Sequence, residues 1–179
     1  MWKLSLWLAV YSIAVWGADQ KPTSLNVGRT ALDKDVLKAD RFVTPDGKGL
    51  PAGHGNAVEG KAIFERRCSK CHGQRGEGAD DAALAGGIGS LGKPKELRTV
   101  GSFWPHAPGV WDYVNRAMPF KEPGSLSADQ VYAVVAYILN LNGLVEAQDE
   151  MNAKSLPKVK MPNRDGFVKD PRPDVKANR

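Results

Sequence analysis

The chain has 179 residues and a formal net charge of +5, which is enough for one or two domains and too short for a large catalytic barrel. Hydrophobic residues make up 42% and charged residues 25% of the sequence, and the mean hydropathy is −0.37. This composition is typical of a globular protein and excludes a mostly disordered chain. Two cysteines are too few for a disulfide framework. Together with only three histidines, they also supply too few ligands for a structural zinc site that uses several cysteines.

Residues 1–18 predict a secretory signal peptide. One cation, Lys3, precedes an apolar run from Leu4 to Val15, and the small residues Gly17 and Ala18 mark the expected cleavage site. An uncleaved anchor is the alternative, but the roughly 12 apolar residues fall short of the roughly 20 that a spanning helix needs. We therefore expect a periplasmic protein with no stable membrane span after cleavage.

Residues 19–55 form an N-terminal extension ahead of the first strong helical pattern. Thr30 and Asp33 are a weak capping signal for a short helix, and residues 44–51 predict a turn followed by extended chain. Asn56 can then cap a helix that brings apolar groups to one face and runs to Arg67.

The segment Cys68-Ser-Lys-Cys71-His72 has the C-x-x-C-H pattern of c-type haem attachment. Both thiols add to the vinyl groups of one porphyrin, and the next residue places its imidazole under the iron. A thioredoxin-like redox pair is the alternative, but it requires a βαβ context, whereas the flanking segments here are helical. The motif therefore predicts one covalent haem c on Cys68 and Cys71, with His72 as an axial iron ligand.

Two further helices are expected after the motif. Residues 108–117 predict a short helix, and Ser127 with Gln130 forms a capping box that opens a longer helix ending near Asn142. The glycine-rich run at 85–91 is expected to be a loop at the haem edge, because it lacks the lysine pattern and preceding strand of a phosphate-binding loop. Apolar residues at helical spacing line one face of the longer helix: Val131, Val134, Val135 and Ile138.

A helix, the haem motif, loops and a final amphipathic helix resemble the class I cytochromes c. This resemblance implies a mostly α protein with the class I cytochrome c fold, here extended by N- and C-terminal arms. It also implies that the first and last helices cross closely through a glycine and aromatic side chains, which Gly60, Phe64 and Tyr137 match. The haem domain is expected to span residues 56–146.

The same resemblance implies a methionine ligand in the loop before the last helix. Met118 lies there, and Pro119 ends the preceding helix and stiffens the chain, so we expect Met118 to be the second axial iron ligand. His106 is the rival, whereas Met151 and Met161 follow the last helix and would need a long return path. His54, between glycines, is expected to be a solvated loop residue.

Residues 147–179 are expected to form an extended basic C-terminal arm. From Lys154 onward the sequence has eight Lys or Arg residues and three Asp residues, so this segment accounts for the whole net charge of +5. We expect it to dock on a partner through Val159, Met161 and Phe167, because disordered polar tails are poor in such groups. The alternative is that it wraps its own haem domain.

Four segments resemble a narrower group within this family. They are similar to segments in the cytochrome subunits of Sox-type sulfane dehydrogenases and of sulfite dehydrogenases. The four segments are residues 45–51, 99–105, 116–120 and 155–167. This resemblance implies a partner subunit with a molybdenum cofactor that oxidises a sulfur compound and passes electrons to the haem. Some members of the sulfane group carry a second haem domain, whereas this sequence has one C-x-x-C-H motif.

The function expected from these features is electron transfer in a complex, by a subunit that is not catalytic alone and that passes electrons to a downstream cytochrome c. A free-standing electron shuttle is the alternative. A haem enzyme such as a peroxidase is a third alternative; it would need an open or labile iron position, and ligation by both His72 and Met118 would leave none open. No nucleic-acid partner is expected, because no nucleic-acid-binding fold is indicated.

Overall fold

The computed structural model describes residues 28, 30–39, 42–169 and 172, in two units that comprise residues 1–39 and 40–179. The predicted signal peptide lies outside the described residues. In the first unit, the short helix expected near Thr30 is α1 (Asp33–Ala39). The carbonyl oxygen of Leu32 accepts the first amide hydrogen bonds of this helix, from Asp35 (2.8 Å) and Val36 (3.0 Å).

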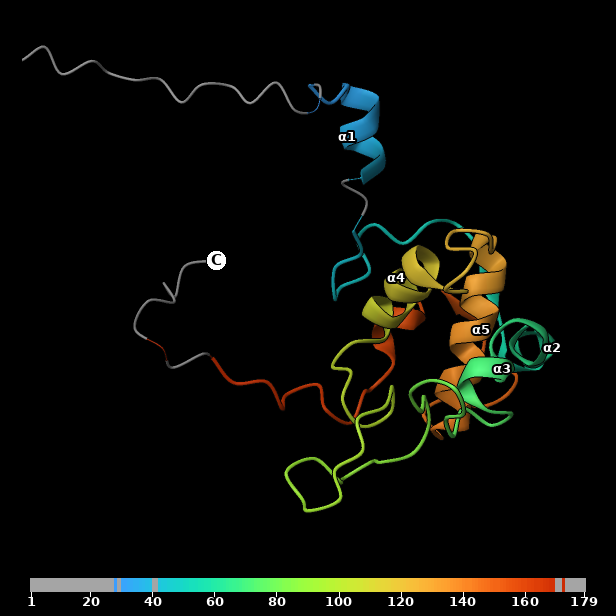
Figure 1. The fold of residues 1–179 in the computed structure, drawn as a ribbon, viewed down its shortest axis with the longest axis vertical. Coiled ribbons are helices and arrows are strands. Elements are labelled where there is room, and N and C mark those ends of the chain that lie inside the picture. The colour runs from blue at the N-terminus through green and yellow to red at the C-terminus, as the bar shows by residue number, and fades with distance from the viewer. Residues whose placement is uncertain (1–27, 29, 40–41, 170–171, 173–179) are drawn as a thin grey trace, which may run out of the picture. The chain divides into compact units, whose positions relative to one another are not determined.

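The second unit is mostly helical, as predicted (Figure 1). Its elements in chain order are β1 (His54–Gly55), α2 (Ala57–Arg67), α3 (Ser69–His72), α4 (Ala107–Ala117), α5 (Ala128–Leu141), β2 (Met151–Asn152) and the 3₁₀ helix η1 (Leu156–Lys158). The two strands pair antiparallel, with His54 opposite Asn152 and Gly55 opposite Met151. Among the described residues, no helix has the length and apolar character needed to cross a membrane.

The predicted helix starts at Asn56 and Ser127 are confirmed, and both are capping boxes, although a box was expected only at Ser127. Asn56 Oδ1 accepts the amide of Glu59 at 3.0 Å, and the Glu59 carboxylate accepts the amide of Asn56 at 3.1 Å. Ser127 and Gln130 make the equivalent pair of bonds at the start of α5, at 3.3 and 2.9 Å. These bonds satisfy amides that have no partner inside the helix, so each start is determined by local chemistry.

The crossing of α2 and α5 forms the centre of the core. Every residue of α5 from Val131 to Leu139 is buried, and the Phe64 ring lies 5.2 Å from the Tyr137 ring. A Cβ atom at Gly60 would collide with the backbone carbonyl of Ala133 and would lie 2.9 Å from Tyr137 Cβ. The crossing expected at Gly60 is therefore confirmed, and it requires a residue without a side chain.

We expect Gly60→Ala to destabilise the protein by about 1–3 kcal/mol or more, because the methyl group has no room against the backbone of α5. Gly109 in α4 is a matched control, since an added Cβ would meet Trp104 at 3.6 Å, an ordinary contact distance. Gly109→Ala should be neutral or stabilising by roughly 0.5–1 kcal/mol through helix propensity. Urea unfolding of the two variants measures the contrast, and equal stabilities would contradict it.

The parts of the two extensions that the structure describes within the second unit, residues 42–55 and 147–169, pack on its core. The Tyr132 hydroxyl donates to the Pro51 carbonyl at 2.9 Å, and burial raises the pKa of Tyr132 to about 12, so the phenol stays protonated. After β2, the side chains of Leu156, Val159 and Met161 are buried in the main core.

The expectation that the segment from Lys154 onward docks on a partner through Val159, Met161 and Phe167 is wrong for the first two. Val159 and Met161 are 8% and 3% exposed because they complete the core of their own domain, which supports the self-wrapping alternative. Phe167 remains 55% exposed and packs edge-on against Phe103, with 5.4 Å between ring centroids. Among the described residues of this segment, Lys154, Lys158, Lys160 and Lys169 are exposed.

Candidate functional site

The C-x-x-C-H motif occupies two consecutive helical turns. Cys68 ends α2, with its amide bound to the Phe64 carbonyl at 2.8 Å, and its own carbonyl accepts the amides of Cys71 (3.1 Å) and His72 (3.0 Å) in α3. The structure therefore brings the three predicted residues together on adjacent turns. Both thiols are free and half-buried, and burial raises the pKa of Cys68 to about 11.

A backbone carbonyl orients the imidazole of His72. Its Nδ1 lies 2.8 Å from the carbonyl oxygen of Ala82. Because a carbonyl oxygen can only accept, Nδ1 carries the proton and Nε2 keeps its lone pair. Histidines that bind metals through one nitrogen typically donate the other N–H to such a partner, which fixes the ring and its tautomer. The geometry prepares Nε2 of His72 for an iron ion.

Polar side chains hold the long loop between α3 and α4. Asn142, at the end of α5, donates to the Leu84 carbonyl at 3.1 Å and accepts the Gly86 amide at 3.1 Å. These bonds anchor the start of the glycine-rich run, which is a loop as predicted.

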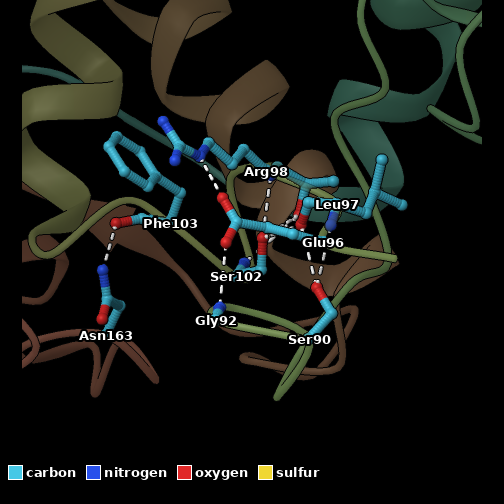
Figure 2. A network of polar contacts seen from close by, with 9 residues as sticks. Ser90, Gly92, Glu96, Leu97, Arg98, Ser102, Phe103 and Asn163 are labelled. Atoms are coloured by element: carbon cyan, nitrogen blue, oxygen red, sulfur yellow. Dashed lines mark hydrogen bonds and ion pairs between the residues drawn. The ribbon is translucent and has the colours of Figure 1, made fainter. Parts of the chain in front are cut away.

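A second network stabilises the part of this loop that precedes α4 (Figure 2). Ser102 Oγ donates to the Leu97 carbonyl at 2.6 Å, and Glu96 accepts the Gly92 amide at 2.8 Å. Asn163 Nδ2 donates to the Phe103 carbonyl at 2.7 Å, so the C-terminal segment is tied to the loop. The backbone that leads into α4 is therefore held both by bonds within the loop and by a bond from the C-terminal segment.

Met118 lies at the end of α4, where its amide binds the Val114 carbonyl at 3.0 Å. Its side chain is half-buried and, like that of Cys68, packs against the main core. The other candidate methionines, Met151 and Met161, are buried within that core as packing residues. His54 is exposed on β1, and its backbone amide donates to Asp129 at 2.8 Å.

Two buried side-chain nitrogen atoms in the described residues lack a hydrogen-bond partner, and both belong to the region of α4. They are Nδ1 of His106, the residue that caps α4, and Nε1 of Trp111, which is 2% exposed. Nδ1 of His106 can donate or accept, depending on its tautomer. A buried donor without a partner costs about 1–3 kcal/mol, so the indole N–H of Trp111 indicates an acceptor that the polypeptide does not supply. The carboxylates of a haem are such acceptors. The free thiols, the oriented imidazole and the thioether provide a donor set that fits the same group.

Sequence reasoning missed two contributors to this site. Trp111 was expected only as a residue of a short helix, and no residue was expected to orient His72. The contribution of Trp111 could have been suspected, because its indole N–H lies on an apolar helix face and needs an acceptor. The second had no signal, because the group involved is the backbone carbonyl of Ala82.

The comparisons with known proteins agree with this geometry. The family model for cytochrome c matches residues 57–142. Among solved structures, the chain is similar to a chain of the sulfane dehydrogenase SoxCD from Paracoccus pantotrophus, with 43% sequence identity and a TM-score of 0.74. The match covers 83% of this chain and 74% of that chain.

We expect the mature protein to carry covalent haem through Cys68 and Cys71. Intact-mass analysis of exported protein should show the mass of one haem added, and acid acetone should not extract it. The double variant Cys68→Ala/Cys71→Ala should lose the added mass, whereas His54→Asn, which changes an exposed residue, should retain it. Extraction of haem from the wild-type protein by acid acetone would contradict the prediction.

We expect Met118→Ala to abolish the weak far-red absorption band that sulfur-to-iron ligation gives in the oxidised protein. Met161→Leu is the control, because this change preserves the volume of a buried side chain and leaves Met118 in place. A band that survives in Met118→Ala would show that the assignment is wrong. The variant His106→Ala tests the rival ligand in the same spectrum.

Proposed function

The chain belongs to the cytochrome c family, as a class I cytochrome c related to the Sox proteins, and from this premise we propose its place in an electron-transfer chain. We propose that it is a periplasmic monohaem cytochrome that serves as a subunit of a molybdenum sulfane or sulfite dehydrogenase. In this role it accepts electrons from the molybdenum subunit and passes them to a downstream cytochrome c.

In this proposal, one pair of residues attaches the porphyrin covalently and a second pair binds the iron. Cys68 and Cys71 would form the thioether links, and His72 and Met118 would bind the iron. A haem c bound in this way supplies a centre that gains and loses one electron, with a potential raised by the methionine. The Ala82 carbonyl orients His72, and Met118 lies at the end of α4, which supports these two residues as the iron ligands. With both iron positions filled, we expect no substrate chemistry at this site.

The observation that carries the proposal is the extent of the likeness to the SoxCD chain. The match covers 83% of this chain, and therefore continues beyond the cytochrome c domain at residues 57–142 into the extensions. In this structure the extensions pack against each other: a Cβ atom at Gly47 would lie 2.5 Å from Pro157 Cγ. These two residues belong to segments that a minimal cytochrome c does not need, which favours a role shared with the Sox cytochromes.

A free-standing electron shuttle is the second candidate, and one observation favours it. The C-terminal segment buries Leu156, Val159 and Met161 in its own domain, so the domain core is complete without a partner. A shuttle would bind the molybdenum subunit transiently, whereas a subunit would remain bound through purification.

We expect the haem-loaded cytochrome to co-purify with the molybdenum subunit and to become reduced when sulfite or thiosulfate is added to the complex. Visible absorption of the reduced haem measures the electron transfer, and the substrate that reduces it identifies the partner's chemistry. Reduction without co-purification would favour the shuttle. Neither co-purification nor reduction by either substrate would contradict both proposals.

Charge variants of the C-terminal segment can refine this experiment. Lys158 and Lys160 are exposed beside the buried Val159 and, within the described residues, form no ion pair. If this surface meets an acidic partner, Lys158→Glu/Lys160→Glu should slow association and weaken its salt dependence without lowering the melting temperature. Lys93→Glu, in the loop before α4, is the matched control.

A further inference from the structure

The loop between α4 and α5 has few apolar contacts with the core. Residues 120–125 are all exposed, and the side chain of Phe120 is 81% exposed. The two ends of the loop are fixed, because the Met118 amide binds the last turn of α4 and Ser127 caps α5. A segment with few buried apolar contacts opens easily unless other bonds hold it. The position of this loop, which begins directly after Met118, therefore depends on polar bonds.

Arg67 makes such bonds from the other side of the proposed haem site. It is the last residue of α2 and directly precedes Cys68. Its Nη2 donates to Glu122 Oε2 at 2.7 Å and to Ser125 Oγ at 2.8 Å. Both acceptors belong to the loop, at positions 55 and 58 residues further along the chain. One guanidinium thus connects the helix that leads into the haem motif with the loop that follows Met118.

Hydrogen bonds within the loop extend this connection to Met118. The Glu122 amide donates to the Pro119 carbonyl at 2.8 Å, and the Ser125 amide donates to the Glu122 carbonyl at 3.3 Å. Pro119 is the residue next to Met118. A bond from Arg67 to Glu122 therefore restrains the backbone beside the proposed iron ligand.

The chemistry of Arg67 suits a local restraint. A guanidinium stays charged and presents several donors in a rigid plane, so it can bind a carboxylate and a hydroxyl together. The side chain of Arg67 is 36% exposed and that of Glu122 is 64% exposed. A charge pair with this exposure contributes little to global stability. Its effect is expected in the opening of the loop and not in the unfolding of the domain.

We propose that Arg67 is a positioning residue that holds the loop after Met118 closed and thereby slows the exchange of Met118 for other iron ligands. The inference rests on the proposed haem ligands and adds to them a residue that controls how long Met118 stays bound. In such an exchange the thioether sulfur leaves the iron and another ligand takes its place, with no change in oxidation state. Slow exchange suits a centre that transfers electrons and carries out no substrate chemistry.

The test is the rate at which saturating imidazole displaces Met118 from the oxidised, haem-loaded protein, followed as loss of the far-red sulfur-to-iron band. At saturation the rate reports the opening of the loop, because the concentration of imidazole no longer limits it. Arg67→Gln should raise the rate roughly two- to fivefold, the range that loss of an exposed charge pair gives. Arg67→Lys keeps the charge but not the planar fork, so its rate should lie between the two.

Arg66→Gln is the matched control. It removes the same charge from the neighbouring exposed residue, which forms no ion pair in the part of the chain that the structure describes. Its rate should equal that of the wild-type protein. Salt provides a second readout, because screening of the charge pair should raise the wild-type rate and leave that of Glu122→Gln unchanged. The melting temperature of Arg67→Gln should stay close to that of Arg66→Gln.

The outcomes separate this inference from the proposed haem site. If Arg67→Gln exchanges Met118 no faster than the wild-type protein, or if Arg66→Gln accelerates the exchange equally, the inference is overturned and the haem ligands stand. If the wild-type protein has no far-red band, Met118 is not an iron ligand, and both the inference and the proposed ligation fail.

Discussion

The contact of α2 with α5 at Gly60 is the constraint on which the rest of the structure depends. Because Gly60 has no side chain, α2 lies directly against the backbone of α5 at Ala133. α2 ends at Arg67, and Cys68 connects it directly to α3, which carries Cys71 and His72. The position of the haem motif is therefore set by a packing contact two to three helical turns away. The same helix α5 ends at Asn142, which anchors the loop that carries Ala82 and Leu84.

The N- and C-terminal extensions of the minimal cytochrome c domain contribute to its core. β1 and β2 pair at the point where the extensions meet, and Met151, Leu156 and Met161 are buried in the same core as Phe64. The lysines of this segment face solvent while its apolar residues face inward, so one stretch of chain contributes to both stability and surface charge. Stability and surface charge can therefore be altered separately by mutation.

Much of the fold and of the haem motif could be predicted from the sequence, because the signals that determine them are local. The starts of α2 and α5 follow from capping boxes within four residues, and the haem motif occupies five consecutive positions. The pairing of His54 with Asn152 could not be predicted, because two-residue strands distant in sequence leave no periodic pattern. The alternation of Lys158, Val159, Lys160 and Met161 is a half-buried pattern that could have indicated self-wrapping. His72 and Met118 as iron ligands, and the domain boundaries at 56 and 146, stay predictions.

The antiparallel pairing of β1 with β2 has a consequence for how this domain can be combined with others. Because β1 lies beside β2, the segment that leads into α2 and the segment that follows α5 meet at one location, and both continue into the core on the far side of the pair. The haem-binding unit therefore does not end at the strand pair. Fusion or exchange of this unit has to keep residues on both sides of the pair, because their removal would expose part of the core.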